Sequence, residues 1–432
     1  MENKPEIREL SLYVHIPFCQ AKCNYCDFLS FGGCGYSVQK QYAEALCREI
    51  EAYEPIAEEY RVKTIFFGGG TPSYMDAALL EQVMESIRRV FCVKQDAEIT
   101  IEGNPDSLTR EKLAVYQKMG INRLSIGLQS ANDDMLRVLG RVHNYDQFIA
   151  AYNSARQAGF NNINVDLMSG LPGESRESYI RTLAKVVKLQ PEHISAYSLT
   201  VEEGTPLSEN EELLELLPSE EEDRQLYART KLLLKNSGYD RYEISNYAKQ
   251  GFACQHNIVY WTGGEYLGVG LGASSYLKVW LGEDRCETLR FHGVENLDEY
   301  IGRFLQSNGM MEDDYTNLFH AFEDSGEESP MDKYRQYEDS ALLEFIRDYY
   351  RDLHFSTRRD EMEEFMFLGL RMTRGISKAE FQKRFGTAIE SVYGKVITKY
   401  KEKELLLEEN GRLYLSDAGI DVSNVIMAEF ML

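Results

Sequence analysis

The stretch SLYVHIPFCQAKCNYCDF, residues 11–28, combines a predicted strand with three clustered cysteines. Residues 11–16 are mostly apolar, which predicts a short buried strand. Three cysteines, Cys19, Cys23 and Cys26, follow directly in a C-x3-C-x2-C arrangement. Parallel α/β folds bind their ligands at the carboxyl ends of strands. The stretch therefore predicts a strand whose carboxyl end carries a loop for metal or redox chemistry.

The pattern of a strand followed by a polar or glycine-rich loop recurs along the first half of the chain. Helical periodicity separates most of these strands, for example over residues 76–91 and 146–160. Strands that alternate with helices predict a parallel sheet, and about six units predict a partial (β/α)6 barrel rather than a closed eight-fold one. The other predicted strands are residues 63–67, 97–102, 123–128, 162–167 and 193–199.

The C-terminal part is predicted to be a smaller α/β module that resembles a winged helix. A helix is expected over residues 361–372, and a hairpin turns at Asn410–Gly411. Residues 309–330 contain seven acidic residues and no Lys or Arg, which predicts an exposed insertion. The expected domains are a core over 1–245, a glycine- and aromatic-rich extension over 246–308, an acidic insertion or linker over 309–357, and the C-terminal module over 358–432.

Composition narrows the classes of protein. The chain has 432 residues, 43% of them hydrophobic, and a formal net charge of -23. This charge argues against a nucleic-acid partner and against docking on anionic lipid. We expect no membrane insertion and a cytoplasmic location, because no apolar stretch approaches the roughly 18 residues of a membrane span and the first residues are polar. Clustered cysteines in a reducing compartment indicate metal or redox chemistry rather than disulfides.

The number of clustered cysteines limits the kind of metal site. A structural zinc site takes four ligands, so zinc would have to recruit a residue such as His15. Thiolates also hold iron–sulfur clusters. Three thiolates on a four-iron cluster leave one iron without a protein ligand, which suits a substrate or a cofactor. The spacing alone leaves both sites open.

The C-x3-C-x2-C arrangement, with the aromatic Tyr25 between its last two cysteines, resembles that of radical S-adenosylmethionine (SAM) proteins. The resemblance implies a radical SAM barrel in which Cys19, Cys23 and Cys26 hold a 4Fe–4S cluster and the open iron binds SAM. GGGTPS (68–73) is similar to the family's SAM-binding glycine motif, and the resemblance continues through EGNPDS, RLSIGLQS, LGRVH and VDLMSGLPGES. The SAM-binding positions that it implies are Tyr13, Phe28, Gly69, Gly70, Thr71, Glu102, Gln129, Arg141 and Asp166.

Two branches of this family compete over nearly the whole chain. Oxygen-independent coproporphyrinogen III dehydrogenases carry a fourth cysteine two residues past the third and a long N-terminal extension. Here Phe28 stands at that position, and few residues precede the first predicted strand. HNIVYW (256–261) instead resembles the H-N-x-x-Y-W motif of HemW-type haem chaperones. A radical SAM methyltransferase is a third reading, although no residue singles out a methyl acceptor.

The HemW-type reading implies haem as a further cofactor, with His256 as the candidate iron ligand, because imidazole is the commonest protein ligand of haem iron. Its partner would be an acceptor protein that receives the haem, and analogy suggests a membrane-bound respiratory enzyme. GVGLGA (268–273) superficially suggests a dinucleotide-binding loop. It lacks a strand–helix–strand frame, so we reject that interpretation.

Overall fold

The computed structural model describes residues 7–281, 285–305, 346 and 350–431. A twelve-stranded sheet organises them, in the order β14-β13-β12-β11-β1-β4-β5-β6-β7-β8-β10-β9. Its six central strands, β1 to β8 in this order, run parallel and coincide with the six predicted strands. They are β1 (Arg8–Ile16), β4 (Tyr60–Gly69), β5 (Cys92–Gly103), β6 (Arg123–Gln129), β7 (Ile163–Ser169) and β8 (His193–Ser198).

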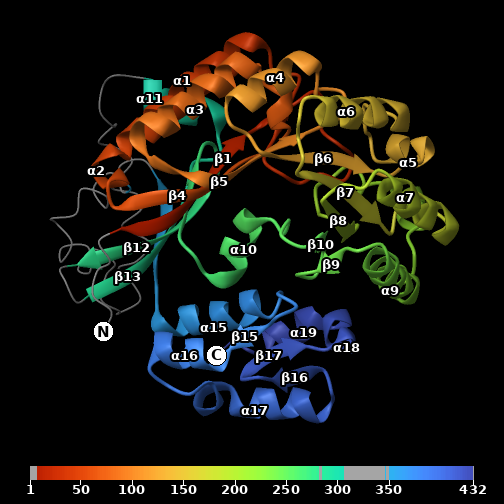
Figure 1. Cartoon of the computed structure of the whole chain (residues 1–432), viewed down its shortest axis with the longest axis vertical. Coiled ribbons are helices and arrows are strands. Elements are labelled where there is room, and N and C mark those ends of the chain that lie inside the picture. The colour runs from red at the N-terminus through yellow and green to blue at the C-terminus, as the bar shows by residue number, and fades with distance from the viewer. Residues whose placement is uncertain (1–6, 282–284, 306–345, 347–349, 432) are drawn as a thin grey trace.

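Helices cover the convex face of this curved sheet (Figure 1). The two helices predicted by periodicity are present as α3 (Ala77–Val90) and α6 (Tyr145–Gln157). A capping box at Asn144 starts α6, and Gly159, with φ +97°, lies just after its end. The other helical elements before β9 in the chain are α1 (Tyr36–Ala52), α2 (Glu54–Ala57), η1 (Pro72–Tyr74), α4 (Arg110–Lys118), α5 (Asp133–Val138), α7 (Arg176–Lys188), α8 (Glu211–Leu214) and α9 (Glu220–Asn236).

β11 adds a seventh parallel strand beside β1, and antiparallel strands extend the sheet beyond β11 and beyond β8, so the sheet stays open. Gly270 and Gly272, both with positive φ, turn β11 into the antiparallel β12 without a helix, so the rejection of a dinucleotide loop is confirmed. The flanking elements are β9 (Asp240–Arg241), β10 (Asn246–Ala248), α10 (Gln255–Thr262), β11 (Tyr266–Val269), β12 (Ser274–Leu281), β13 (Arg285–His292), α11 (Leu297–Leu305) and β14 (Arg351–Ser356).

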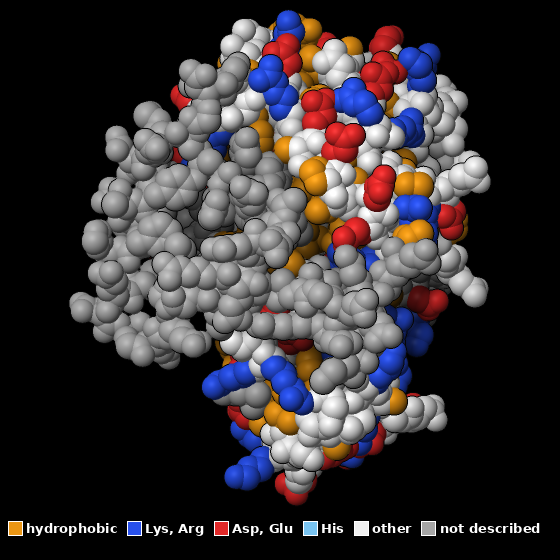
Figure 2. All heavy atoms as spheres, turned by 90° about the vertical axis from the view of Figure 1, so that its left-hand side faces the viewer, with side chains coloured by type: hydrophobic (Ala, Val, Ile, Leu, Met, Phe, Trp, Pro, Cys, Tyr) orange, Lys and Arg blue, Asp and Glu red, His pale blue; other side chains and the backbone are white. Residues whose placement is uncertain are grey.

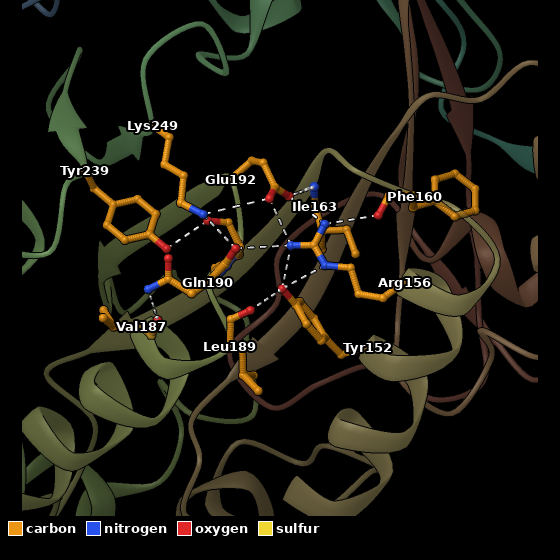
Figure 3. Close-up of polar contacts among 11 residues, drawn as sticks. Tyr152, Arg156, Phe160, Ile163, Val187, Leu189, Gln190, Glu192, Tyr239 and Lys249 are labelled. Atoms are coloured by element: carbon orange, nitrogen blue, oxygen red, sulfur yellow. Dashed lines mark hydrogen bonds and ion pairs between the residues drawn. The ribbon is translucent and has the colours of Figure 1, made fainter.

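A polar cluster links the amino ends of β7 and β8 (Figure 3). This end of the sheet is opposite to the one that carries the cysteine loop and the GGGTPS loop. Arg156 of α6 pairs with Glu192 at 2.8 Å and donates to the carbonyl of Phe160. Glu192 also accepts from the backbone N–H of Ile163. Polar side chains at this end of a parallel barrel stabilise the fold rather than bind substrates.

The C-terminal residues form a separate module with its own core, which includes Met366, Phe381 and Leu413. Helices precede a three-stranded sheet whose hairpin turns at Asn410–Gly411, so the predicted winged-helix-like arrangement is confirmed. Its elements are α15 (Arg358–Gly369), β15 (Ile376–Ser377), α16 (Lys378–Phe385), α17 (Ile389–Glu402), β16 (Leu406–Glu409), β17 (Arg412–Leu415), α18 (Asp417–Asp421) and α19 (Ser423–Ala428).

The module contacts both flanks of the open sheet. On one flank, Arg371 pairs with Glu243 beside β10 at 3.3 Å. On the other, Glu364 of α15 pairs with Arg290 of β13 at 2.6 Å, and Arg384 of α16 donates to the hydroxyl of Tyr276 on β12 at 3.1 Å. The two ends of the sheet are thus joined through the C-terminal module.

The predicted acidic segment 309–330 lies outside the described residues. The limits of the four predicted domains stay predictions. No helix among the described residues is both long and apolar enough to cross a membrane. Figure 2 shows the face that lies on the left-hand side of Figure 1. On the described part of this face, basic and acidic side chains are intermixed.

Candidate functional site

The cysteine loop and the GGGTPS loop lie against each other at the carboxyl edge of the sheet. The backbone N–H of Gly70 donates to the carbonyl of Ile16 at 2.9 Å, and that of Thr71 donates to the carbonyl of Phe18 at 2.8 Å. A Cβ atom added at Gly70 would lie 2.9 Å from Cys19 Sγ. Glycine is therefore required for this close approach of backbone to the first cysteine.

The three cysteines of the loop are free thiols at the rim of the barrel. Cys19 is buried, whereas Cys23 and Cys26 are half-buried. Burial raises the pKa of the Cys19 and Cys26 thiols, and the backbone N–H of Phe28 opposes this at Cys26. The side chain of Phe28 itself is 66% exposed.

These three thiols lie close to one another in the loop. Within the described part of the chain, no group of three His, Cys, Asp or Glu side chains is close enough to hold one metal ion. A four-iron cluster binds each of its thiolates through a different iron, so its ligands stand further apart. Cys19 and Cys26 each interact electrostatically with Cys23, which places the three sulfurs in one local group.

Arg141 brings a positive charge to this group. Its Nη1 lies 3.5 Å from Cys23 Sγ, and its Nη2 donates to the carbonyl of Gly127 at 2.7 Å and to Asn104 Oδ1 at 2.5 Å. Its Nε has no partner. Gln129 lies nearby at the end of β6 with φ +69°, a conformation that only a few per cent of non-glycine residues adopt. Arginine here can clamp a carboxylate beside the cysteine loop.

A cavity of about 230 Å³ lies inside the barrel and is lined by Tyr13, Glu102, Asp166 and His256, among others. Burial raises the pKa of Glu102 to about 8, and the nearby Asp166 adds to the shift. Burial also raises the pKa of Asp166, although Asn164 and Ser125 donate to its carboxylate at 2.7 and 3.0 Å. The Gly69 backbone N–H faces Glu102 and links this cavity to the rim.

His256 lies on α10, which occupies the concave side of the sheet (Figure 1). It is 1% exposed, and both ring nitrogens are engaged: Nδ1 with the Thr64 hydroxyl at 2.7 Å and Nε2 with the Tyr260 hydroxyl at 2.9 Å. Burial, assisted by the charge of Arg123, lowers the pKa of His256 to about 3, so the imidazole is neutral. Neutral imidazole is the form that binds metals.

The predicted residues thus fall into two groups that are linked to each other, with Phe28 as a separate case. The rim group surrounds the cysteine loop, the lumen group lines the cavity, and Gly69 connects them. Phe28 places its backbone N–H beside Cys26 of the rim group, and its side chain is exposed. The rim group is Cys19, Cys23, Cys26, Gly70, Thr71, Gln129 and Arg141, and the lumen group is Tyr13, Glu102, Asp166 and His256.

Sequence reasoning missed several polar residues of the site. Arg123 lines the cavity at 2% exposure, and its Nε has no hydrogen-bond partner. Ser125, Asn164 and Ser195 join it in the lumen, and Asn104 lies in the rim group. The sequence did carry a signal for the residues on strands. Polar residues two positions apart in an otherwise apolar strand must point to the same face of the sheet.

Two family profiles match different parts of the chain. The Radical SAM superfamily profile matches residues 13–186, and the HemN C-terminal domain profile matches residues 356–422. Coproporphyrinogen III oxidase (HemN) from Escherichia coli, described as a radical SAM enzyme, superposes with a TM-score of 0.75 at 22% identity over 99% of this chain and 91% of that one. This likeness establishes the open radical SAM fold.

Two of the curated relatives match over nearly the full length, and a third matches over part of it. Heme chaperone HemW of Bacillus subtilis (strain 168) is 33% identical over 429 residues, covering 98% of this chain and 99% of the relative. Heme chaperone HemW of Lactococcus lactis (strain IL1403) is 30% identical over 98% of this chain and 97% of the relative. The Escherichia coli (strain K12) protein of the same name is 38% identical over 264 residues, covering 61% of this chain and 69% of the relative.

Proposed function

Because this chain belongs to the radical SAM superfamily and, within it, to the HemW family, we propose that it binds haem and transfers it to an acceptor protein. The observation that carries this proposal is the 33% identity to a heme chaperone across 98% of the chain. Phe28, in place of a fourth cysteine, supports the same branch. The proposed acceptor is a haem-requiring membrane enzyme, and the proposed location is the cytoplasm.

The proposed cofactors are a 4Fe–4S cluster and SAM. Cys19, Cys23 and Cys26 hold the cluster, which supplies one-electron chemistry when bound. Arg141 lies beside Cys23 and is the proposed clamp for the SAM carboxylate, because its guanidinium is always charged. The other proposed SAM contacts are Tyr13, Phe28, Gly69, Gly70, Thr71, Glu102, Gln129 and Asp166.

His256 is the proposed haem ligand, and its surroundings define what binding requires. Nε2 must give up its 2.9 Å hydrogen bond to Tyr260 before it can bind iron. The cavity of about 230 Å³ is also smaller than the ~300–1,000 Å³ of pockets for drug-sized ligands. Haem binding through His256 therefore requires α10 to move or the lumen to widen.

Coproporphyrinogen dehydrogenation is the alternative function, since the fold is shared with HemN. A fold supports several chemistries, so the choice must come from the site. A methyltransferase on the same core is a third candidate, and neither is favoured by a described residue. Anaerobic assays with SAM and dithionite should give no conversion of coproporphyrinogen III. Product that appears with stoichiometric loss of SAM would establish the dehydrogenase instead.

The first prediction concerns haem itself. In an anaerobic haemin titration of cluster-reconstituted protein, the wild type should bind saturably with a sharp Soret band, and His256→Ala should lose this binding. His193→Ala is the matched control, because His193 is equally buried in the barrel and both its ring nitrogens are hydrogen-bonded. Its haemin binding should persist.

Each outcome of the titration is informative. A wild type that does not bind haemin saturably would overturn the chaperone proposal. Equal binding by wild type and His256→Ala would leave the chaperone proposal standing and remove His256 as the ligand. Loss of binding in both histidine variants would indicate a damaged barrel rather than a lost ligand.

A further inference from the structure

The side chain of Asn104 lies between two residues that touch cysteine sulfurs. Its Nδ2 donates to Thr71 Oγ1 at 3.1 Å, and its Oδ1 accepts from Arg141 Nη2 at 2.5 Å. Thr71 Oγ1 in turn lies 3.4 Å from Cys19 Sγ, and Arg141 Nη1 lies 3.5 Å from Cys23 Sγ. A single amide therefore joins two of the three thiols through one side chain on each side.

Chemistry fixes the direction of each hydrogen bond in this chain. Arg141 can only donate, so the amide atom that faces it must be the oxygen, and the NH₂ group must face Thr71. The amide proton occupies a lone pair of the Thr71 oxygen. The hydroxyl proton of Thr71 is then free to point at Cys19 Sγ. Asn104 thus leaves the hydroxyl proton available for the sulfur, and a Cys19 thiolate can only accept it.

Asn104 is itself held firmly. Its backbone N–H donates to Ser73 Oγ at 3.2 Å, and its carbonyl accepts from Ser107 Oγ at 3.0 Å. The two serine hydroxyls are 2.5 Å apart and buried. The loop after β5 is therefore fixed to the loop after β4, and the amide is presented in one place.

We infer that Asn104 is a positioning residue, which aims the Thr71 hydroxyl at Cys19 and holds Arg141 beside Cys23. The inference rests on the proposed cluster and SAM site and is independent of haem. A hydrogen bond donated to a cluster thiolate stabilises the extra electron of the reduced cluster and so raises its reduction potential. Fixing the guanidinium of Arg141 pre-organises the clamp for the SAM carboxylate.

Two substitutions separate the two roles. Asn104→Asp keeps an acceptor for Arg141 but cannot donate to Thr71, whose hydroxyl then donates to the new carboxylate instead of to Cys19. Its reduction potential should fall in an electron paramagnetic resonance redox titration, while its SAM affinity by calorimetry is retained. Asn104→Ala loses both contacts, so its potential should fall and its SAM affinity should weaken by about 10-fold, as for other outer-shell partners.

Two further variants serve as controls. Thr71→Val removes the hydroxyl and should reproduce the fall in potential of Asn104→Asp. Asn122→Ala loses an amide that makes two backbone hydrogen bonds to β5, at 2.9 and 2.8 Å, away from the cysteines. It reports the cost in thermal stability of losing such an amide, and its potential and SAM affinity should match the wild type.

The outcomes distinguish this inference from the proposed function. Asn104→Ala with an unchanged potential and unchanged SAM affinity would overturn the positioning role alone. A wild type that assembles no cluster would overturn the proposed cofactors and the positioning role together. The haemin titration is a separate measurement. Its result tests neither the positioning role of Asn104 nor the proposed cofactors.

Discussion

At the scale of single residues, the site depends on a backbone atom that leaves no room for a side chain. Gly70 packs its Cα against the first cysteine, so that an added Cβ would lie 2.9 Å from Cys19 Sγ and 3.0 Å from the carbonyl oxygen of Phe18. The Phe18 oxygen is a backbone atom, and Cys19 Sγ is a proposed cluster ligand that cannot turn away and still hold the cluster. Any larger residue must therefore displace the cysteine loop or the glycine loop.

Gly70→Ala should reduce the iron and sulfide content of reconstituted protein, because the displaced Cys19 no longer meets the geometry of the cluster. Iron and sulfide analysis per chain provides the measurement. Gly394→Ala is the control, since its added Cβ would come no closer than 4.0 Å to Glu390 on α17. Helix propensity predicts that it gains up to about 1 kcal/mol of stability and keeps its full iron content. A fully loaded Gly70→Ala protein would contradict the close-approach argument.

At the scale of elements, one buried carboxylate ties together parts of the chain that are far apart in sequence. Glu49 of α1 accepts from the backbone N–H of Gly270 at 2.8 Å and from the hydroxyls of Tyr300 on α11 and Tyr350. Burial raises the pKa of Glu49 to about 7, although these donors oppose the shift. The folded state therefore binds a proton at Glu49 more tightly than the unfolded state does.

This shift predicts a pH dependence of stability. The contribution is fully present below the unfolded pKa of about 4.5, and it is lost as pH rises through about 7. Relative to Glu49→Gln, the wild type should lose on the order of 3 kcal/mol of unfolding free energy between pH 5 and pH 8. Urea unfolding at several pH values measures this difference. Glu44→Gln, at an exposed position of the same helix, should leave the profile unchanged, and a flat difference for Glu49→Gln would refute the shift.

Elements also mark how far the sequence could be read. The six parallel strands were predictable because each is a short apolar run between helical patterns. The helix α10 was not predicted, because its eight residues are too few for a clear period. The roles of Arg123 and Asn104 could not be predicted either. Each depends on contacts between strands or loops distant in the chain, and these are set by the register of the sheet.

At the scale of the whole molecule, the contact between core and module includes a buried charge. Glu243 is 0% exposed and accepts from the backbone N–H of Ser245 and from Asn246, each at 2.7 Å. Its charged partner is Arg371, which also stacks over Trp261 of α10 at 4.3 Å. Burying a carboxylate without its cation is costly.

Arg371→Met should therefore destabilise the protein by about 2–3 kcal/mol. This is less than the ~3–5 kcal/mol for breaking a fully buried pair, since Arg371 is 28% exposed. The urea midpoint measures the loss. Arg374→Met removes a cation from an exposed site three residues later and should change stability little. Equal midpoints for the two variants would show that the pair does not support the interface.

The open sheet described above has a mechanical consequence. In a closed barrel, backbone hydrogen bonds all the way round fix the bore. Here the C-terminal module joins the two flanks: Arg371 pairs with Glu243 and the backbone N–H of Thr373 donates to the carbonyl of Tyr242 on one flank, and Glu364 pairs with Arg290 on the other. Spreading the flanks breaks these contacts, including the bridge between Glu243 and Met372, and leaves the ladders of the twelve-stranded sheet intact. The lumen can therefore widen without breaking any pairing within the twelve-stranded sheet, and the C-terminal module is the part that joins the two flanks.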